Sequence, residues 1–382
     1  MKIAIDTLFE HATAPSSAMD YLINLCTYMP EMAPEHEFYI LVSTQSAPRF
    51  KSLCRSNVQL VNCFASNDRR TLRILAVQTV VPWRMRQHKI DLLFSAGNVC
   101  PWLGNFCRVV KINTMHHLRT PAMIGRIRSL YRRFAFKASA RIADAVLANS
   151  SVTQSDICEL LGINEDKVIV VWEAVDECFV PAEGKAQERV CAHFGLKRPF
   201  FLFSSTLWPY KNAHTLIRAF GSLCRKTGFD GELVFAGRSD NASYQKELDE
   251  LVLAENVAGK VRFLGFVPNR EMPPLYSAAA VFVYPSLSET FGKPLVEAMR
   301  CGVPVIASNT SCIPEIAGDG ALLVDTSDAE ELASAMGRVL ADESLRAELV
   351  QRGKQRSAWF SWRTSALQTL DLFNNTLAHW HK

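Results

Sequence analysis

The chain has 382 residues, enough for two domains of ordinary size with separate cores. Its 48% apolar and 21% charged residues are typical of a soluble globular enzyme, and no run of 18 uncharged apolar residues predicts a transmembrane helix. The first residues lack the basic-then-apolar form of a signal peptide. The eleven cysteines are scattered without a CxxC pair, which favours reduced thiols in the cytoplasm. We expect no metal site and no catalytic cysteine.

The modest net charge of +4 conceals a strongly basic block. From Arg49 to Arg141, eighteen Lys and Arg stand against two Asp, which gives +16 and leaves −12 for the rest of the chain. Such a block points to an anionic partner, which is a phospholipid surface, a lipid-diphosphate acceptor or nucleic acid.

Short apolar runs alternate with longer amphipathic stretches along the whole chain. The first series of predicted strands comprises Lys2–Asp6, Glu37–Ser43, Val58–Asn62, Asp91–Phe94, Val109–Met115, Ala145–Ala148 and Val168–Val171. The second comprises Phe200–Ser204, Glu232–Ala236, Val261–Leu264, Ala280–Tyr284, Val303–Ser308 and Ala321–Val324. Helical patterns between them include Ser151–Leu161, His214–Thr227, Tyr244–Asn256 and Ala329–Leu340. This alternation predicts parallel sheets with helices on both faces.

Two strand series predict two doubly wound α/β domains. The polar segment Pro181–Arg198 is the best linker, so we expect domains at residues 1–180 and 181–361. Ligands of open α/β sheets bind beyond the carboxyl ends of the strands. Two such domains facing each other across a cleft would therefore carry the chemistry on the loops after their strands.

The strongest site signal lies in residues 281–308, VFVYPSLSETFGKPLVEAMRCGVPVIAS. A strand is followed by a loop, and then Gly292 and Pro294 suit the start of a helix. The amides near Phe291, Gly292 and Lys293 should lie at the positive end of that helix, where a diphosphate binds well.

Two carboxylates flank this helix start, Glu289 in the loop and Glu297 in the helix. Carboxylates do not favour phosphate, but they accept hydrogen bonds from the hydroxyls of sugars and ribose. The alternative is that both acids only complement the helix dipole.

The spacing E-x7-E within PSxSExFGxPxxEAMxCGxPVIAS resembles the signature of the family 4 retaining glycosyltransferases of GT-B fold. The resemblance implies that Glu289 contacts the donor sugar and Glu297 the ribose. Lys293 replaces the usual apolar residue, and it either touches phosphate or is solvated.

A second segment, FLFSSTLWPYKNAHTLIRAF, places Lys211 after a strand and a turn, before a helix that we expect Asn212 to cap. It resembles the family pattern G-T-L-x-P-R-K-N, whose Lys binds the donor diphosphate, so Lys211 inherits that role. Tyr210 stands where an Arg is usual, and Thr206 lies where some relatives carry another Arg. Arg238, after the next strand, could substitute for the missing guanidinium.

Two N-terminal segments resemble the family more loosely. In KINTMHHLRTP, His116 takes the position of the His near the donor sugar and acceptor, although a structural role is the alternative. His117 stands where Asp is usual. Ser17 lies in the loop after the first strand, where the family carries glycines, and its hydroxyl and amide could contact the ligand. In the family the helix after the last motif crosses back to the N-terminal domain, and residues 362–382 should do so here.

The basic residues from Arg69 to Lys89 and from Arg126 to Arg141 alternate with apolar and aromatic ones. This spacing suits an anionic membrane surface, and equally a core-facing helix whose polar face is basic. No RRM, KH or zinc signature supports nucleic-acid binding.

The resemblance predicts a retaining glycosyltransferase without a cofactor. The cysteine usage predicts a cytoplasmic protein, and the basic block predicts that it is peripheral on the inner face of the membrane. It would move a hexose, with GDP-mannose as the favoured donor, to a glycan or lipid-diphosphate-linked acceptor in polysaccharide biosynthesis. The glutamates, Lys211 and His116 are the expected catalytic and donor-binding residues, together with Gly292, Phe291, Lys293, Thr206, Arg238 and Ser17. The alternatives are a non-catalytic glycosyltransferase-like subunit, a UDP-sugar-using glucosyl- or N-acetylglucosaminyltransferase, and a nucleotide-sugar epimerase, which the E-x7-E spacing disfavours.

Overall fold

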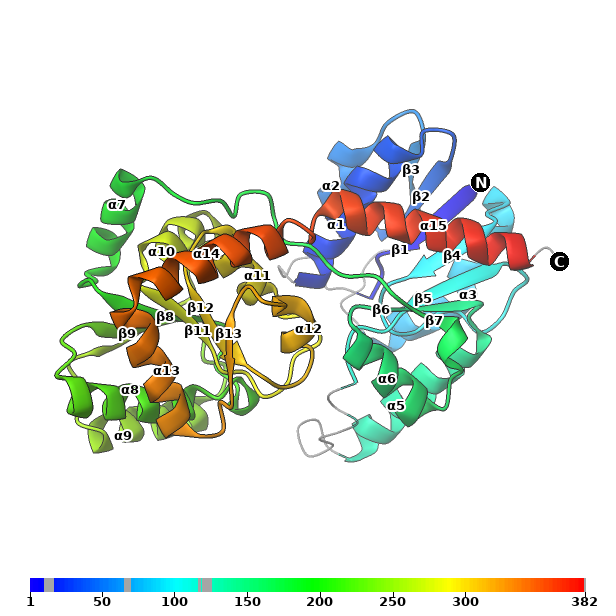
Figure 1. The fold of residues 1–382 in the computed structure, drawn as a ribbon. Helices are drawn as coiled ribbons and strands as arrows, with labels where there is room; N and C mark the ends of the chain where they lie inside the picture. The colour runs from blue at the N-terminus through cyan, green and yellow to red at the C-terminus, as the bar shows by residue number, and fades with distance from the viewer. Residues whose placement is uncertain (10–16, 65–69, 116–117, 119–125, 381–382) are drawn as a thin grey trace. The chain divides into compact units, whose positions relative to one another are not determined.

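Two parallel sheets organise the chain in the computed structural model, which describes residues 1–9, 17–64, 70–115, 118 and 126–380 (Figure 1). They belong to two units. The N-terminal unit comprises Met1–Ala174 and Ser361–Lys382, and the C-terminal unit comprises Val175–Phe360. The chain divides slightly before the boundary predicted at residue 180. The prediction of two doubly wound α/β domains is confirmed.

The sheet of the N-terminal unit has the order β3-β2-β1-β4-β5-β6-β7, and its neighbouring strands pair in parallel. The strands are β1 (Lys2–Asp6), β2 (Glu37–Ser43), β3 (Val58–Phe64), β4 (Leu92–Ser95), β5 (Cys107–Lys111), β6 (Ala145–Ala148) and β7 (Val168–Val170). The longer helices are α1 (Ser17–Met32), α3 (Arg70–His88), α5 (Arg126–Ile142), α6 (Ser151–Leu161) and α15 (Trp362–Trp380), with the short α2 (Ala47–Phe50). The fifth strand begins and ends before the predicted Val109–Met115.

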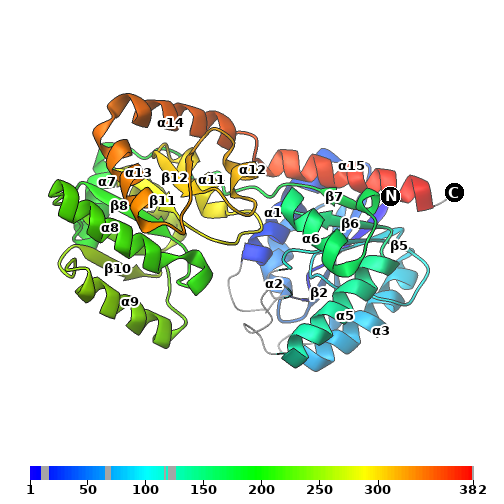
Figure 2. The same ribbon diagram turned by 60° about the horizontal axis from the view of Figure 1, so that its bottom comes forward.

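Alternate residues of these strands face two different cores, as the pleat of a strand requires. One core joins the sheet to α1 and α15, and the other face packs against α3, α5 and α6. The rings of Phe94 and Phe373 lie 5.3 Å apart, and those of Tyr21 and Trp362 lie 5.8 Å apart. The expectation that the last helix returns to the N-terminal domain is therefore confirmed; α15 lies beside α1 (Figures 1 and 2).

The sheet of the C-terminal unit has the order β10-β9-β8-β11-β12-β13, again in parallel. The strands are β8 (Phe200–Ser204), β9 (Glu232–Ala236), β10 (Val261–Gly265), β11 (Val281–Tyr284), β12 (Val305–Ser308) and β13 (Leu322–Val324). The helices are α7 (Gly184–Phe194), α8 (Ala213–Thr227), α9 (Ala242–Ala254), α10 (Met272–Ala278), α11 (Lys293–Arg300), α12 (Ile313–Ala317), α13 (Ala329–Ala341) and α14 (Glu343–Ser357).

The prediction of a linker at Pro181–Arg198 is wrong, because this segment contains helix α7. The helix buries Val190 and Cys191, packs against α10, and ends at Gly195 in the left-handed conformation with φ 62°. Its few apolar positions gave a weak sequence signal, although they suffice to hold it on the C-terminal unit.

Candidate functional site

The candidate site lies where the strand order of the C-terminal sheet reverses. Strands β8 and β11 are neighbours there, but the chain leaves β8 towards β9 on one side and β11 towards β12 on the other. Loops diverging in this way open a crevice at the carboxyl ends, the usual ligand position in doubly wound sheets. Lys211 follows β8 and Glu289 follows β11, so the topology brings both predicted residues to this point.

Lys211 ends a short 3₁₀ turn, Pro209–Lys211, whose position is fixed by the next residue. Asn212 adopts the left-handed conformation with φ 64° and donates from Nδ2 to the carbonyl oxygens of Pro285, at 3.2 Å, and Thr326, at 2.7 Å. Asn212 is the N-cap residue of α8, as expected, but its side chain makes no capping hydrogen bond. Instead, this amide ties the turn to the loop after β11.

The ammonium of Lys211 and the carboxylate of Glu289 form an ion pair with an Nζ–Oε1 distance of 2.5 Å, and both side chains are only 10% exposed. The buried hydroxyl of Tyr284 donates to the same Oε1 and lies 3.5 Å from Nζ. Within the described part of the chain, Oε2 of Glu289 accepts no hydrogen bond. That oxygen is therefore available to a ligand hydroxyl.

The backbone of Glu289 is held by Ser311. The Ser311 hydroxyl accepts from the Glu289 amide at 3.0 Å and donates to the Glu289 carbonyl at 2.8 Å. Burial, reinforced by the charge of Glu289, raises the pKa of the Tyr284 phenol well above its usual value and that of Tyr210 to about 12. Both phenols therefore stay protonated at neutral pH, and the Tyr284 hydroxyl donates to the carboxylate.

Helix α11 begins beside this cluster. Gly292 precedes its first residue with φ 85°, a conformation that favours glycine, and no described side chain caps the helix start. A Cβ on Gly292 would stand 3.4 Å from the Tyr284 ring, so the backbone passes close to Tyr284. The Phe291 side chain is buried against Phe360, 5.5 Å between ring centroids, so only its backbone can face a ligand. The side chain of Lys293 is partly buried.

Glu297 lies one turn further along α11, where Oε2 accepts a hydrogen bond of 2.9 Å from the Tyr276 hydroxyl. Burial raises the pKa of Glu297 from 4.5 to about 7, although Tyr276 and the charge of Lys293 act in the opposite direction. The carboxyl group is thus close to half ionised at neutral pH.

Thr206 and Arg238 lie on adjacent loops after β8 and β9. Their backbones meet because Gly237 has no side chain: a Cβ there would stand 1.8 Å from the Ser205 carbonyl oxygen. Leu207 donates its amide to the Arg238 carbonyl at 2.8 Å. The guanidinium of Arg238 lies over the ring of Phe266, 5.9 Å from its centroid.

The residues predicted in the N-terminal unit are only partly described. His116 and His117 lie outside the described residues, and so does the side chain of Ser17, whose backbone begins α1. In the same predicted segment, Lys111 is buried and its Nζ lies 2.7 Å from Glu173.

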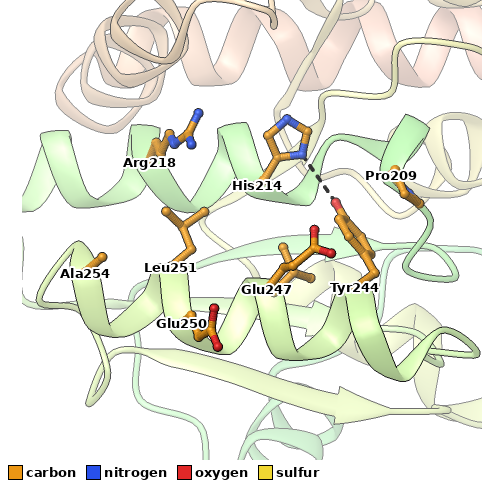
Figure 3. Close-up of a pocket in the computed structure, with 9 residues that line it drawn as sticks. Pro209, His214, Arg218, Tyr244, Glu247, Glu250, Leu251 and Ala254 are labelled. Atoms are coloured by element: carbon orange, nitrogen blue, oxygen red, sulfur yellow. Dashed lines mark hydrogen bonds between the residues drawn. The ribbon is translucent and has the colours of Figure 1, made fainter.

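A pocket of about 520 Å³ between α8 and α9 is separate from this cluster (Figure 3). It is lined by His214, Arg218, Tyr244 and Glu247 among others, and His214 lies 3.4 Å from the Tyr244 hydroxyl. Burial lowers the pKa of His214, which disfavours a second cation there. Glu247 and Glu250 outnumber Arg218 in the lining, so the pocket does not suit a diphosphate.

Sequence reasoning missed the residues that support Lys211 and Glu289. Tyr284 ends a buried strand and was indistinguishable from a core residue, and Ser311 lies in a polar loop after β12. Only the position of Tyr284 at a strand end next to the switch point could have indicated its role.

Two family models match the chain. The model of "Glycosyl transferases group 1" matches residues 186–356, and that of "Glycosyltransferase Family 4" matches residues 20–178. The chain belongs to the family 4 glycosyltransferases of GT-B fold.

Among its relatives, the O-antigen chain mannosyltransferase RfbU of Salmonella typhimurium is 30% identical over 84% of this chain and 86% of its own. The O-antigen chain mannosyltransferase B of Escherichia coli is 32% identical over 60% of each chain. The match between this chain and the Escherichia coli serotype-specific mannosyltransferase WbdA covers 29% of the length of WbdA. The structure of Anabaena Alr3699/HepE in complex with UDP and glucose has a TM-score of 0.76 at 21% identity, covering 98% of this chain and all of that one. That likeness concerns the fold.

Proposed function

We propose that the chain is a retaining hexosyltransferase that uses a nucleotide-diphosphate sugar in polysaccharide biosynthesis. The observation that carries the proposal is the cluster of Lys211, Glu289 and Tyr284 at the switch point, beside the uncapped start of α11. This arrangement presents a cation and a helix N-terminus to a diphosphate, and a carboxylate to sugar hydroxyls.

In the proposed reaction, Lys211 and the backbone near Gly292 hold the diphosphate and stabilise the charge that grows on it. Oε2 of Glu289 accepts a hydrogen bond from a sugar hydroxyl, and Glu297 accepts one from the ribose. The acceptor oxygen bonds to the anomeric carbon on the face from which the phosphate oxygen leaves. The acceptor proton passes to the departing phosphate, so no enzyme nucleophile is needed and configuration is retained.

The proposed donor is GDP-mannose, because two of the relatives above are named as mannosyltransferases of O-antigen chains. When GDP-mannose and UDP-glucose are supplied together, GDP should be released and UDP should not. Release of UDP alone would instead favour a UDP-sugar-using enzyme.

The proposed acceptor is a glycan carried on a lipid diphosphate at the inner face of the cytoplasmic membrane. The basic block between Arg49 and Arg141 supports this choice, because a small neutral sugar would not require such a field. None of the described helices is long and apolar enough to cross a membrane.

The test of the proposed chemistry is Glu289→Gln, which keeps the shape of the side chain and removes its charge. Nucleotide release from GDP-mannose should fall about a hundredfold or more. GDP alone should bind at least as tightly as before, because Glu289 is assigned to the sugar and no longer neutralises Lys211. His214→Asn, in the pocket between α8 and α9, is the matched control and should keep wild-type turnover. Wild-type turnover in Glu289→Gln would refute the assignment, and absence of turnover in the wild type would favour a non-catalytic subunit.

A further inference from the structure

The basic block of the N-terminal unit exposes large apolar side chains that a core-facing helix would bury. On α5, Ile127 is 87% exposed, Leu130 is 71% exposed and Phe134 is 63% exposed. Their spacing of three and four residues places them on one face of the helix. The opposite face, with Phe136 and Ala140, packs into the core. The helix is thus apolar on both its buried and its solvent-facing sides.

The apolar surface continues from α5 to α3 across the loop at residues 100–105. The Trp102 ring packs edge-on against Phe134 at 5.8 Å, and its indole nitrogen donates to Ser139 of α5. From α3, Gln78 accepts from the Trp102 amide at 2.9 Å and donates to the Cys100 carbonyl at 3.1 Å. Polar bonds to both helices therefore hold this loop in place.

Arg108 also holds this loop in place. Its buried guanidinium donates to the carbonyl oxygens of Pro101, Gly104 and Phe106 at 2.8–2.9 Å. On the outer side of this ordered loop Leu103 is 72% exposed, and on α3 Leu75 and Trp83 are 60% and 55% exposed. We call the six exposed residues the apolar face: Leu75, Trp83, Leu103, Ile127, Leu130 and Phe134.

Cations surround the apolar face. The exposed residues Arg86 and Lys89, with Trp83 and Gly104, line a hollow of about 550 Å³ at the end of α3. Within the residues that the structure describes, no ion pair is formed by Arg86, Lys89, Arg128 or Arg133. An ordinary protein partner would offer acidic groups for some of these cations. An anionic bilayer offers both a negative surface for the cations and an apolar interior for the ring and leucine side chains.

From this combination we infer that the apolar face inserts into the acyl region of an anionic bilayer, with the surrounding cations at the phosphate level. The inference rests on the proposed function, which places the acceptor at a membrane. It adds the insertion of apolar side chains to the electrostatic attraction of the basic residues. Contact through charge alone is screened by salt, whereas insertion of apolar side chains is not. Membrane binding should therefore have a component that survives high salt.

The experiment is sedimentation with vesicles of equimolar phosphatidylglycerol and phosphatidylcholine, at low salt and at about 1 M salt, where charges are screened within about 3 Å. Wild-type protein should stay partly bound at high salt. Phe134→Ser and Ile127→Ser should each lower the partition coefficient roughly tenfold to a hundredfold, as expected when a large apolar side chain no longer leaves water. Leu253→Ser, which alters a 66% exposed leucine of α9 in the C-terminal unit, is the matched control and should bind as wild type.

Complete release of the wild type at high salt would overturn the inference, as would unchanged partition in both α5 variants. Ile127 is almost fully exposed, so its replacement should not affect folding, and an unchanged circular dichroism melt would verify this. Nucleotide release in solution should be the same in the α5 variants and the wild type. The two failures can therefore be distinguished. If the apolar face does not insert, nucleotide release is unaffected; if the proposed function is wrong, the wild type releases no nucleotide.

Discussion

Replacing Glu297 by Gln should stabilise the protein at alkaline pH while weakening nucleotide binding. The carboxyl group accepts a hydrogen bond from Tyr276, and burial raises its pKa from 4.5 to about 7. A glutamine can accept the same hydrogen bond without carrying a charge. The variant thus removes the unfavourable free energy of the buried charge and keeps the hydrogen bond to Tyr276.

The size and sign of the effect follow from the two pKa values. Because the folded state holds this proton more tightly than the unfolded state, stability is greatest below pH 4.5 and is lost as the pH rises to about 7. At about 1.4 kcal/mol for each pKa unit, ionisation of Glu297 costs about 3 kcal/mol at pH 8 and less than about 1 kcal/mol at pH 5. Glu297→Gln should recover most of the difference, about 2 kcal/mol, on going from pH 5 to pH 8.

Urea titrations of the wild type and Glu297→Gln at pH 5, 6, 7 and 8 measure this difference, with its pH dependence as the main result. Calorimetry with GDP should show about tenfold weaker binding by the variant at pH 8, since a hydrogen bond to a charged acceptor is stronger than one to an amide. A stability difference that is the same at pH 5 and pH 8 would refute the reasoning from burial. Wild-type GDP affinity would refute the ribose assignment.

Two further changes test the geometry around the switch point. Lys211→Ala should lower turnover roughly a hundred- to a thousandfold, and Lys211→Arg should restore part of it, in steady-state assays of nucleotide release; near-normal turnover in Lys211→Ala would move the phosphate role to Arg238. Gly237→Ala should destabilise the protein by about 2 kcal/mol or more in urea titrations, because its Cβ would overlap the Ser205 carbonyl. The control is Gly259→Ala, whose Cβ would have nothing within 4 Å and which should change stability by less than about 0.5 kcal/mol. Equal stability of the two glycine variants would show that the loops after β8 and β9 can separate freely.

The sheets could be predicted well from the sequence because buried parallel strands are nearly continuous apolar runs. Strands such as Lys2–Asp6 and Phe200–Ser204 have the predicted bounds. Helix α7 was missed because only two of its residues are buried and most of the others are polar. A segment that packs through so small a face looks like a linker in composition.

The positions of Lys211 and Glu289 after their strands were predictable, but their contacts were not. The rule of strand ends and the family resemblance both indicated Lys211 and Glu289. However, the two were assigned to different parts of the donor, and their ion pair across 78 residues of sequence was not expected. The support from Tyr284 and Asn212 depends on which strands are neighbours, and local sequence does not contain that information.

The two sheets have the same strand order around their switch points, but the residues at these points differ, and this difference bears on our proposal that the C-terminal unit binds the donor. In the N-terminal unit the neighbouring strands β1 and β4 end in Asp6 and Ser95. Burial raises the pKa of Asp6 to about 6, so this carboxyl group is mostly ionised at neutral pH and would repel a diphosphate. At the equivalent point of the C-terminal unit, Lys211 supplies a cation and α11 its positive end. The strand order is thus the same around both switch points, but only the C-terminal one combines a lysine with the start of a helix among the described residues, which supports our proposal that this unit binds the anionic half of a nucleotide sugar.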